Sequence, residues 1–420
     1  MPYIITFLFF VLLLLNYRRT VLLFVPFHLL LLMFVFPQTP FSCFDVVAAL
    51  ITALAPFHLF AEFRKFARSY PFYVGSFFML LSVVGTNLFI EPHWPTATLS
   101  FNSFYIYPII VWLCIKDKED LSFVVHAVMF FTIVLGCYAL FELVTSSNPV
   151  IKFFISSGLG NVSVLDYDKV RFGIKRCQSF LSTPAPTGMI FGLVLGTFYW
   201  FDRKYKICND FPKLLLFALC FIGFLISGTR SVIAASFVAL CGIIIKEFIL
   251  SGNVLLKICV ALIAFVFMAP FLLEILDSFI NTDQTAVSGS TSSMRQEQFL
   301  ISLFYWAKSP IWGNGSGFIW HYVQEVDKDI YGAESIWFQL LVDFGAVGAF
   351  AYFSCILNSI IVLCKRNFFW IFIPLAFLAG KTLSTVIGIE MSVLFLFSII
   401  LIKYDELFLK PEGVSNACGK

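Results

Sequence analysis

Charge is scarce in this sequence. Only 13% of its 420 residues are charged, whereas 60% are apolar and the mean hydropathy is +0.92. Soluble globular domains use about 25% charged residues, so this composition excludes an ordinary water-soluble fold. The net charge is only +3, and we expect no nucleic acid among the partners.

Other signals are also absent. The eleven cysteines and five histidines show neither a disulfide framework nor the spacing of metal ligands, so no metal and no cofactor is predicted. Met1 to Tyr3 carry no basic residue and no small-residue cleavage site follows, which argues against a cleaved signal peptide. We find no convincing internal repeat.

Apolar residues instead form runs long enough to cross a bilayer. A hydrocarbon core roughly 30 Å thick needs about 20 helical residues at 1.5 Å each. The sequence predicts an all-α, polytopic integral membrane protein with about 12–13 transmembrane helices, and residues 1–420 are expected to form a single membrane domain. The expected segments are 3–16, 21–37, 44–60, 73–90, 100–115, 121–145, 184–201, 214–228, 231–250, 255–276, 336–364, 367–384 and 387–403.

The basic residues indicate an orientation. Lys and Arg cluster on alternate short loops, and such loops remain on the cytoplasmic side because basic residues are translocated poorly. This places the C-terminus in the cytoplasm and the N-terminus outside. The opposite, extracytoplasmic face then carries two long polar loops, 146–183 and 277–335. Loops of this length are usually functional or disordered, so we look for chemistry there.

The second outer loop contains a predicted helix. Ser293 is spaced to cap it together with Gln296, and Arg295 would lie in its first turn. Apolar side chains then recur at helical spacing at Phe299, Leu303 and Trp306. This pattern predicts an amphipathic helix on the membrane surface.

A polar break, Ser227-Gly228-Thr229-Arg230-Ser231, separates two apolar segments on the outer side. Ser227 or Thr229 can cap the next helix, whose free N–H groups favour an anion. The planar guanidinium of Arg230 matches phosphate oxygens. The alternative is an arginine that only ends a helix at the interface.

Glycines follow in the second outer loop. Gly313, Gly315 and Gly317 lie within Trp312–Gly317, where they allow a close approach between backbone and ligand. The stretch is not a dinucleotide fingerprint, because no strand precedes it. A plain turn is the alternative.

Two acidic residues stand where this loop re-enters the membrane. Nine residues separate Glu334 from Asp343, which is about 13 Å and half a turn on a straight helix, so the two are not expected to share a site. Glu334 has an alternative role as a carboxylate favoured by a helix N-terminus. Inserting the charged side chain of Asp343 near the bilayer core would cost about 2.5–3.5 kcal/mol of free energy, so we expect this residue to have a partner or a functional role.

The first outer loop is basic. Lys169, Arg171, Lys175 and Arg176 precede Ser182–Pro186. They form either a solvated loop or a cationic surface that attracts an anionic lipid-linked substrate.

The order of these features resembles the O-antigen polymerase and ligase superfamily of bacterial envelope glycan assembly. The resemblance covers about residues 170–350. It rests on five features in sequence order, namely Arg176 through Pro184, Ser227–Ser231, Arg295 before an aromatic helix, Lys308–Gly317, and Glu334 with Asp343-Phe-Gly345-Ala-Val-Gly348.

This resemblance implies a metal-independent glycosyltransferase in the bacterial inner membrane. It would take a glycan from undecaprenyl pyrophosphate on the extracytoplasmic face. Arg230 and Arg295 are then expected to stabilise the departing pyrophosphate, with Arg176 as a third cation. Substrate-binding roles are expected for Arg171, His321 and the three glycines, Gly313, Gly315 and Gly317.

Polymerases and ligases of the superfamily differ in the acceptor that receives the glycan. Ligases of the superfamily resemble one another in a histidine before the acidic-x-glycine helix, but this chain has Ala333-Glu334-Ser335 there. A polymerase of O-antigen, capsule or exopolysaccharide repeat units is therefore favoured, with Glu334 as general base and His321 as a possible substitute. The alternatives are a ligase acting on a lipid A-core or protein acceptor, and a flippase or secondary transporter. Membrane lipid and a chain-length regulator are the other expected partners.

Overall fold

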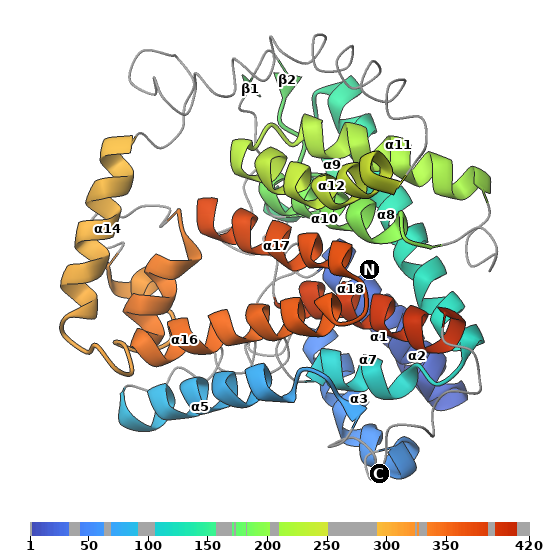
Figure 1. The fold of residues 1–420 in the computed structure, drawn as a ribbon, viewed down its shortest axis with the longest axis horizontal. Helices are drawn as coiled ribbons and strands as arrows, with labels where there is room; N and C mark the ends of the chain where they lie inside the picture. Colours follow the sequence, from blue (N-terminus) through green and yellow to red (C-terminus); the bar gives the residue numbers. More distant parts are fainter. Residues whose placement is uncertain are drawn as a thin grey trace.

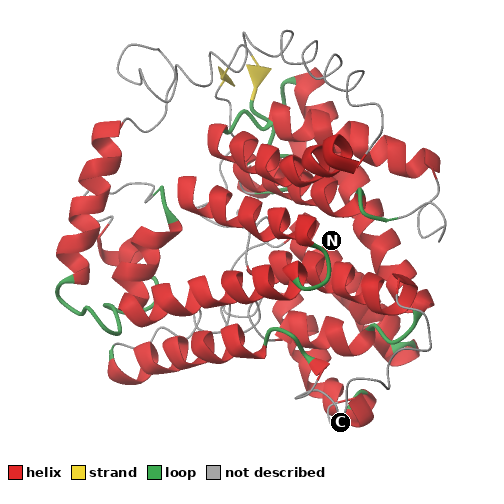
Figure 2. Ribbon diagram, in the orientation of Figure 1, coloured by secondary structure: helices red, strands yellow, loops and turns green. Residues whose placement is uncertain are grey.

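The computed structural model is almost entirely helical (Figure 2). It describes residues 2–32, 43–62, 69–90, 106–156, 170–171, 174–181, 183–201, 210–250, 292–323, 326, 334–384 and 391–409. The helices of the first third are α1 (Pro2–Leu15), α2 (Tyr17–Phe27), η1 (His28–Leu32), α3 (Cys43–His58), α5 (Tyr73–Phe89), α7 (Tyr107–Cys114) and α8 (Lys118–Thr145).

The rest of the chain adds the helices around the candidate site. These are α9 (Pro149–Ser156), α10 (Pro184–Phe198), α11 (Asp210–Ile226), α12 (Arg230–Leu250), α14 (Ser292–Trp306), η4 (Ile319–Val323), α16 (Ile336–Cys364), η6 (Phe368–Ile371), α17 (Phe372–Leu383), α18 (Met391–Tyr404) and η7 (Asp405–Leu409). Every expected apolar segment within the described residues contains helix. The expected segment 255–276 lies outside them.

The structure confirms that the described part of the chain is mostly helical, and it is compatible with a polytopic membrane protein. Two helices, α8 and α16, are long and apolar enough to cross a bilayer, and several shorter apolar helices accompany them. The number of spans stays a prediction. The only strands among the described residues are β1 (Val170–Arg171) and β2 (Ile174–Lys175), a two-residue antiparallel pair in the first outer loop that leaves the all-α class unchanged.

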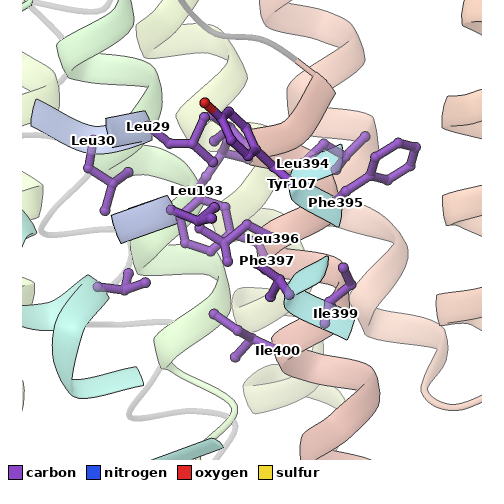
Figure 3. Close-up of a cluster of buried hydrophobic side chains, with 14 of the residues drawn as sticks. Leu29, Leu30, Tyr107, Leu193, Leu394, Phe395, Leu396, Phe397, Ile399 and Ile400 are labelled. Carbon is purple, nitrogen blue, oxygen red and sulfur yellow. The ribbon is translucent and has the colours of Figure 1, made fainter. Parts of the chain in front are cut away.

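Helix α18 forms the centre of the core. Its sequence is apolar on every side, and all its residues except Lys403 are buried. A helix without a polar face lies either in a protein core or in the bilayer, and the burial of α18 places it in the core. Figure 3 shows Leu394 to Ile400 of α18 against Leu29 and Leu30 of η1, Tyr107 of α7 and Leu193 of α10.

Small residues let α10, α12 and α17 pack closely. A Cβ on Gly192 of α10 would lie 2.2 Å from Ser236 Oγ of α12, and one on Gly380 of α17 would lie 2.8 Å from Met189 Sδ and 3.4 Å from Ala235 Cβ. Such contacts bring helix backbones together where lipid supplies no hydrophobic drive. The start of α12 and the end of α17 therefore lie at the same end of the bundle.

Several connections expected on the cytoplasmic side also meet at one end. Arg18 pairs with Asp120, and Lys116 pairs with Glu62. Arg366 binds Asp405 at 2.8 Å and Glu406 at 2.7 Å. These pairs join segments that are far apart in the sequence, so the expected grouping of the basic loops agrees with the fold. Which side of the membrane they occupy stays a prediction.

Helix α14 confirms the helix expected in the second outer loop. It runs crosswise to α5, α16 and α17 near the ends of these helices (Figure 1). The helix buries Gln298, Ser302 and Tyr305. Phe299, Leu300 and Phe304 are exposed, as expected for an apolar face directed at lipid.

Candidate functional site

The turn between α11 and α12 is built around Arg176. The Arg176 Nε–H donates to the Ser227 carbonyl at 3.3 Å, and its Nη2 donates to Thr229 Oγ1 at 2.8 Å. The Cys177 N–H donates to the Ile226 carbonyl at 3.1 Å. The arginine from the first outer loop is therefore bound to the polar break that the sequence singled out.

Arg230 begins α12 directly after this turn. It is buried, with 8% of its surface exposed, as is Arg176. Thr229 Oγ1 donates to the Ser227 carbonyl at 3.2 Å, and its hydroxyl is thus engaged within the turn. Two buried guanidinium groups and the N-terminus of α12 concentrate positive potential here, which suits an anion.

Glu142 is a residue that sequence reasoning missed. Its Oε2 accepts hydrogen bonds from the backbone N–H groups of Gln178 at 3.1 Å and Ser179 at 2.8 Å, and from Asn148 Nδ2 at 3.1 Å. The side chain is fully buried in the last turn of α8. It fixes the chain two residues after Arg176. The signal was a carboxylate inside the otherwise uncharged segment 121–145.

Arg295 and Glu334 form an ion pair. Arg295 Nη2 lies 2.9 Å from Glu334 Oε2 and also donates to the Leu383 carbonyl at 3.3 Å. The Glu334 N–H donates to Gln298 Oε1 at 3.2 Å, which ties the start of α16 to α14. About a third of each charged side chain is exposed. The pair is therefore partly screened by solvent, and it is accessible to a ligand.

The Leu383 contact connects the two groups of residues. Leu383 ends α17, and Gly380, three residues earlier, packs against Met189 of α10 and Ala235 of α12. Arg230 lies at this same end of α12. The fold thus gathers Arg176, Arg230, Arg295 and Glu334 at one end of the bundle, and their roles stay predictions.

The glycine loop folds against a break in α16. Gly345 has φ +67°, and a Cβ there would lie 2.4 Å from the Ile311 carbonyl oxygen. The Ala346 N–H donates to the Pro310 carbonyl at 2.9 Å. A Cβ on Gly313 would lie 2.3 Å from the Asp343 carbonyl oxygen. The backbone that comes close to these glycines is therefore that of α16. Substrate binding by Gly313, Gly315 and Gly317 stays a prediction.

The carboxylate of Asp343 has hydrogen-bond partners, as we expected for a charged residue near the bilayer core. Its Oδ2 accepts from the Gly317 N–H at 3.0 Å, and its Oδ1 accepts from the Ile319 N–H at 2.9 Å. The assumption that one helix carries both residues was wrong, because Glu334 precedes α16, which begins at Ile336. The two acidic residues nevertheless have separate partners, as expected.

Comparison with known families identifies the region that holds most of these residues. Residues 215–353 match the family model described as O-antigen ligase. This part of the chain is therefore similar to the O-antigen ligase family, within the superfamily that the sequence features resemble. No curated protein matches the chain.

The O-antigen ligase match spans about a third of the 420 residues. It contains Arg230, Arg295 and Glu334, and the superfamily consists of glycosyltransferase-like enzymes. Arg176 and Glu142 precede it, so the fold brings residues from outside the matched region to the same site. Their roles, like those of the matched residues, stay predictions.

For two of the predicted site residues the structure describes only the backbone. His321 lies in η4 and Arg171 lies in β1, whereas their side chains, and Lys169, are outside the described residues. Among the residues that the structure describes, no group of three or more His, Cys, Asp or Glu side chains could hold a metal ion.

Proposed function

We propose that this protein polymerises lipid-linked oligosaccharide repeat units of an O-antigen, capsule or exopolysaccharide. The donor is a glycan on undecaprenyl pyrophosphate, and the acceptor is a second lipid-linked repeat unit. The observation that carries this proposal is the Arg295–Glu334 pair at 2.9 Å, at the same end of the bundle as Arg176 and Arg230.

The arginines have one role in this reaction. As the acceptor oxygen bonds to the anomeric carbon of the donor, the bond from that carbon to the pyrophosphate oxygen breaks. The departing pyrophosphate keeps the electron pair, and preorganised cations stabilise its charge. Arg230 and Arg295 supply these cations, and Arg176 is a third.

Glu334 has the complementary role. It accepts the proton that the acceptor hydroxyl loses, as a general base. The ion pair with Arg295 fixes the orientation of the Glu334 carboxylate. Glu334 and Arg295, which are in direct contact, thus act on the acceptor hydroxyl and on the leaving pyrophosphate of the same substitution.

The reaction takes place on the extracytoplasmic face of the bacterial inner membrane. This location is supported by the grouping of the basic loops at the opposite end of the bundle, since such loops are retained in the cytoplasm. In this arrangement the protein crosses the membrane about 12–13 times, and a chain-length regulator contacts its helices.

The sequence at 333–335 favours a polymerase over a ligase. Ala333-Glu334-Ser335 lacks the histidine that ligases of the superfamily share at this point. A ligase that transfers glycan to lipid A-core or to protein is the second candidate. A flippase or secondary transporter is the candidate from another class, and it is less well supported because the arginines gather at one end of the bundle.

A strain lacking this protein separates the three candidates. For a polymerase, surface glycan should collapse to single repeat units on the lipid anchor. Polymer retained on the carrier with no surface glycan would indicate a ligase. Carrier-linked repeat units trapped on the inner membrane face would indicate a flippase. Gel analysis of surface and carrier-linked glycan distinguishes these outcomes.

Variants of the arginines test the proposed chemistry. Arg230→Ala and Arg295→Ala should each abolish polymer while protein remains in the membrane. Glu297→Gln, which changes an exposed charge on the same helix as Arg295, is the control and should keep wild-type chain lengths. Normal polymer from either arginine variant would refute the assigned role.

The proposed reaction requires no metal ion. Purified protein should form polymer from lipid-linked repeat units equally well with and without EDTA. Loss of activity in EDTA, restored by added Mg²⁺, would overturn this part of the proposal.

A further inference from the structure

A cavity lies at the end of the bundle opposite Arg176 and Arg230 of the candidate site. It has a volume of about 490 Å³ and is lined by Tyr199, Trp200, Phe201, Lys213, Leu214, Phe217, Lys246, Asn367, Trp370, Tyr404 and Leu409. These residues come from the segment that follows α10, the first turns of α11, the end of α12, the start of η6, the end of α18 and η7. A volume of this size suits a small polar group rather than a single water molecule.

The cavity is basic. Lys213 and Lys246 line it, and none of its described lining residues is acidic. Lys213 Nζ donates to the Phe201 carbonyl at 2.7 Å, which holds the ammonium group at the cavity wall. Lys246 Nζ lies 4.7 Å from the ring centroid of Trp200. Glu247, which follows Lys246 in the sequence, accepts a hydrogen bond from Tyr199 with its carboxylate.

Aromatic side chains complete the wall. Trp200 and Tyr404 are buried, and Trp370 is 1% exposed. The Trp370 Nε1–H has no acceptor among the described residues. A buried donor without an acceptor costs about 1–3 kcal/mol, and Trp370 lines the same cavity as the two lysines. All three groups suit a ligand that is an anionic acceptor.

We propose that this cavity binds a phosphate group carried by the headgroup of an anionic phospholipid. Basic pockets between helices at the cytoplasmic end of a membrane protein bind such headgroups, and ammonium groups bind phosphate as point charges. Tryptophan and tyrosine favour the level of the headgroups. The proposal rests on the membrane orientation given above and not on the polymerase reaction, so either can fail alone.

Thermal unfolding of the purified full-length chain tests the proposal. In detergent, dioleoyl phosphatidylglycerol should raise the melting temperature by about 3 °C or more above the value with dioleoyl phosphatidylcholine, because a ligand stabilises the state that binds it. Inorganic phosphate is the third addition. If it gives the same rise as phosphatidylglycerol, the ligand is free phosphate and the lipid assignment is wrong.

Variants connect the effect with the cavity. The double variant Lys213→Gln, Lys246→Gln should lose the difference between the two lipids, whereas Lys118→Ala, an exposed lysine expected on the same side, should keep it. Leu214→Glu adds a negative charge at a residue that is 69% exposed, so it should abolish the difference without disturbing the core. An unchanged difference in the double variant or in Leu214→Glu would overturn the proposal.

Discussion

Gly228 determines how Arg176 reaches the turn between α11 and α12. Its φ is +58°, and a Cβ at this position would lie 2.9 Å from Arg176 Cγ. The left-handed conformation costs a residue with a side chain roughly 1–2 kcal/mol. The Cβ would also push Arg176 away from Ser227 and Thr229. Conformation and contact thus both require glycine at this position.

Gly228→Ala should therefore shorten or abolish polymer and lower thermal stability by roughly 1–2 kcal/mol. Gel analysis of chain length and a melting curve measure the two effects. Gly196→Ala is the control, because Gly196 lies inside α10 and its added Cβ would meet Ala239 Cβ at 3.1 Å, a contact that a small shift relieves. Wild-type polymer from Gly228→Ala would show that Arg176 does not need this geometry.

Cys177 follows Arg176 and is buried. Burial, together with the nearby Glu142 carboxylate, raises the pKa of the Cys177 thiol to about 12. A raised pKa means that the neutral thiol dominates at ordinary pH, and only the thiolate is reactive. At pH 8 the thiolate fraction is on the order of 10⁻⁴.

We expect negligible alkylation of Cys177 by iodoacetamide at pH 8 in the native protein, rising as the pH approaches 10. Peptide mapping by mass spectrometry measures the extent of labelling at each cysteine. Cys364, exposed at the end of α16, is the internal control and should react under the same conditions. Rapid native labelling of Cys177 would show that the segment 176–179 opens readily.

At the level of the elements, the break in α16 organises the second outer loop. Gly345 is the only residue inside α16 with non-helical φ and ψ angles. The break frees backbone groups that the loop then uses. The Asn314 N–H donates to the Val342 carbonyl at 2.8 Å, and the Gly315 N–H donates to the Asp343 carbonyl at 3.1 Å.

Gly345→Ala should be among the most damaging substitutions in the chain. It adds left-handed strain of roughly 1–2 kcal/mol and an overpacking cost of roughly 1–3 kcal/mol against Ile311. The measurement is the yield of folded protein and its melting temperature in detergent. Gly196→Ala again serves as the control for a helical glycine. Stability equal to wild type would mean that α16 can run straight through this point.

The helices were predictable and the contacts between them were not. Apolar runs indicated most segments because a bilayer demands about 20 apolar residues per crossing. The spacing of Ser293 and Gln296 predicted a helix at α14, but the capping position was wrong, because α14 begins at Ser292 and Ser293 lies inside it. The Arg295–Glu334 pair joins residues 39 apart, and no local rule selects that pairing. The sequence shows Gly345 but not its φ, and Glu142 appears only as one carboxylate in an apolar run.

At the scale of the whole molecule, the two ends of the bundle carry different chemistry. One end holds paired basic and acidic residues, such as Arg366 with Asp405 and Glu406, and the other holds α14 with the candidate site (Figure 1). Basic residues remain in the cytoplasm because they are translocated poorly. The end with α14 should then face outwards, where lipid-linked pyrophosphate is presented.

Labelling of introduced cysteines tests this orientation directly. Glu297→Cys on α14 and Lys118→Cys at the start of α8 both replace exposed residues, so neither should disturb the fold. A membrane-impermeant maleimide should label Glu297→Cys in intact cells, above the level of the parent chain. It should label Lys118→Cys only after the membrane is permeabilised. The reverse pattern would place Arg295 and Glu334 in the cytoplasm, where a polymerase of translocated repeat units would have no substrate.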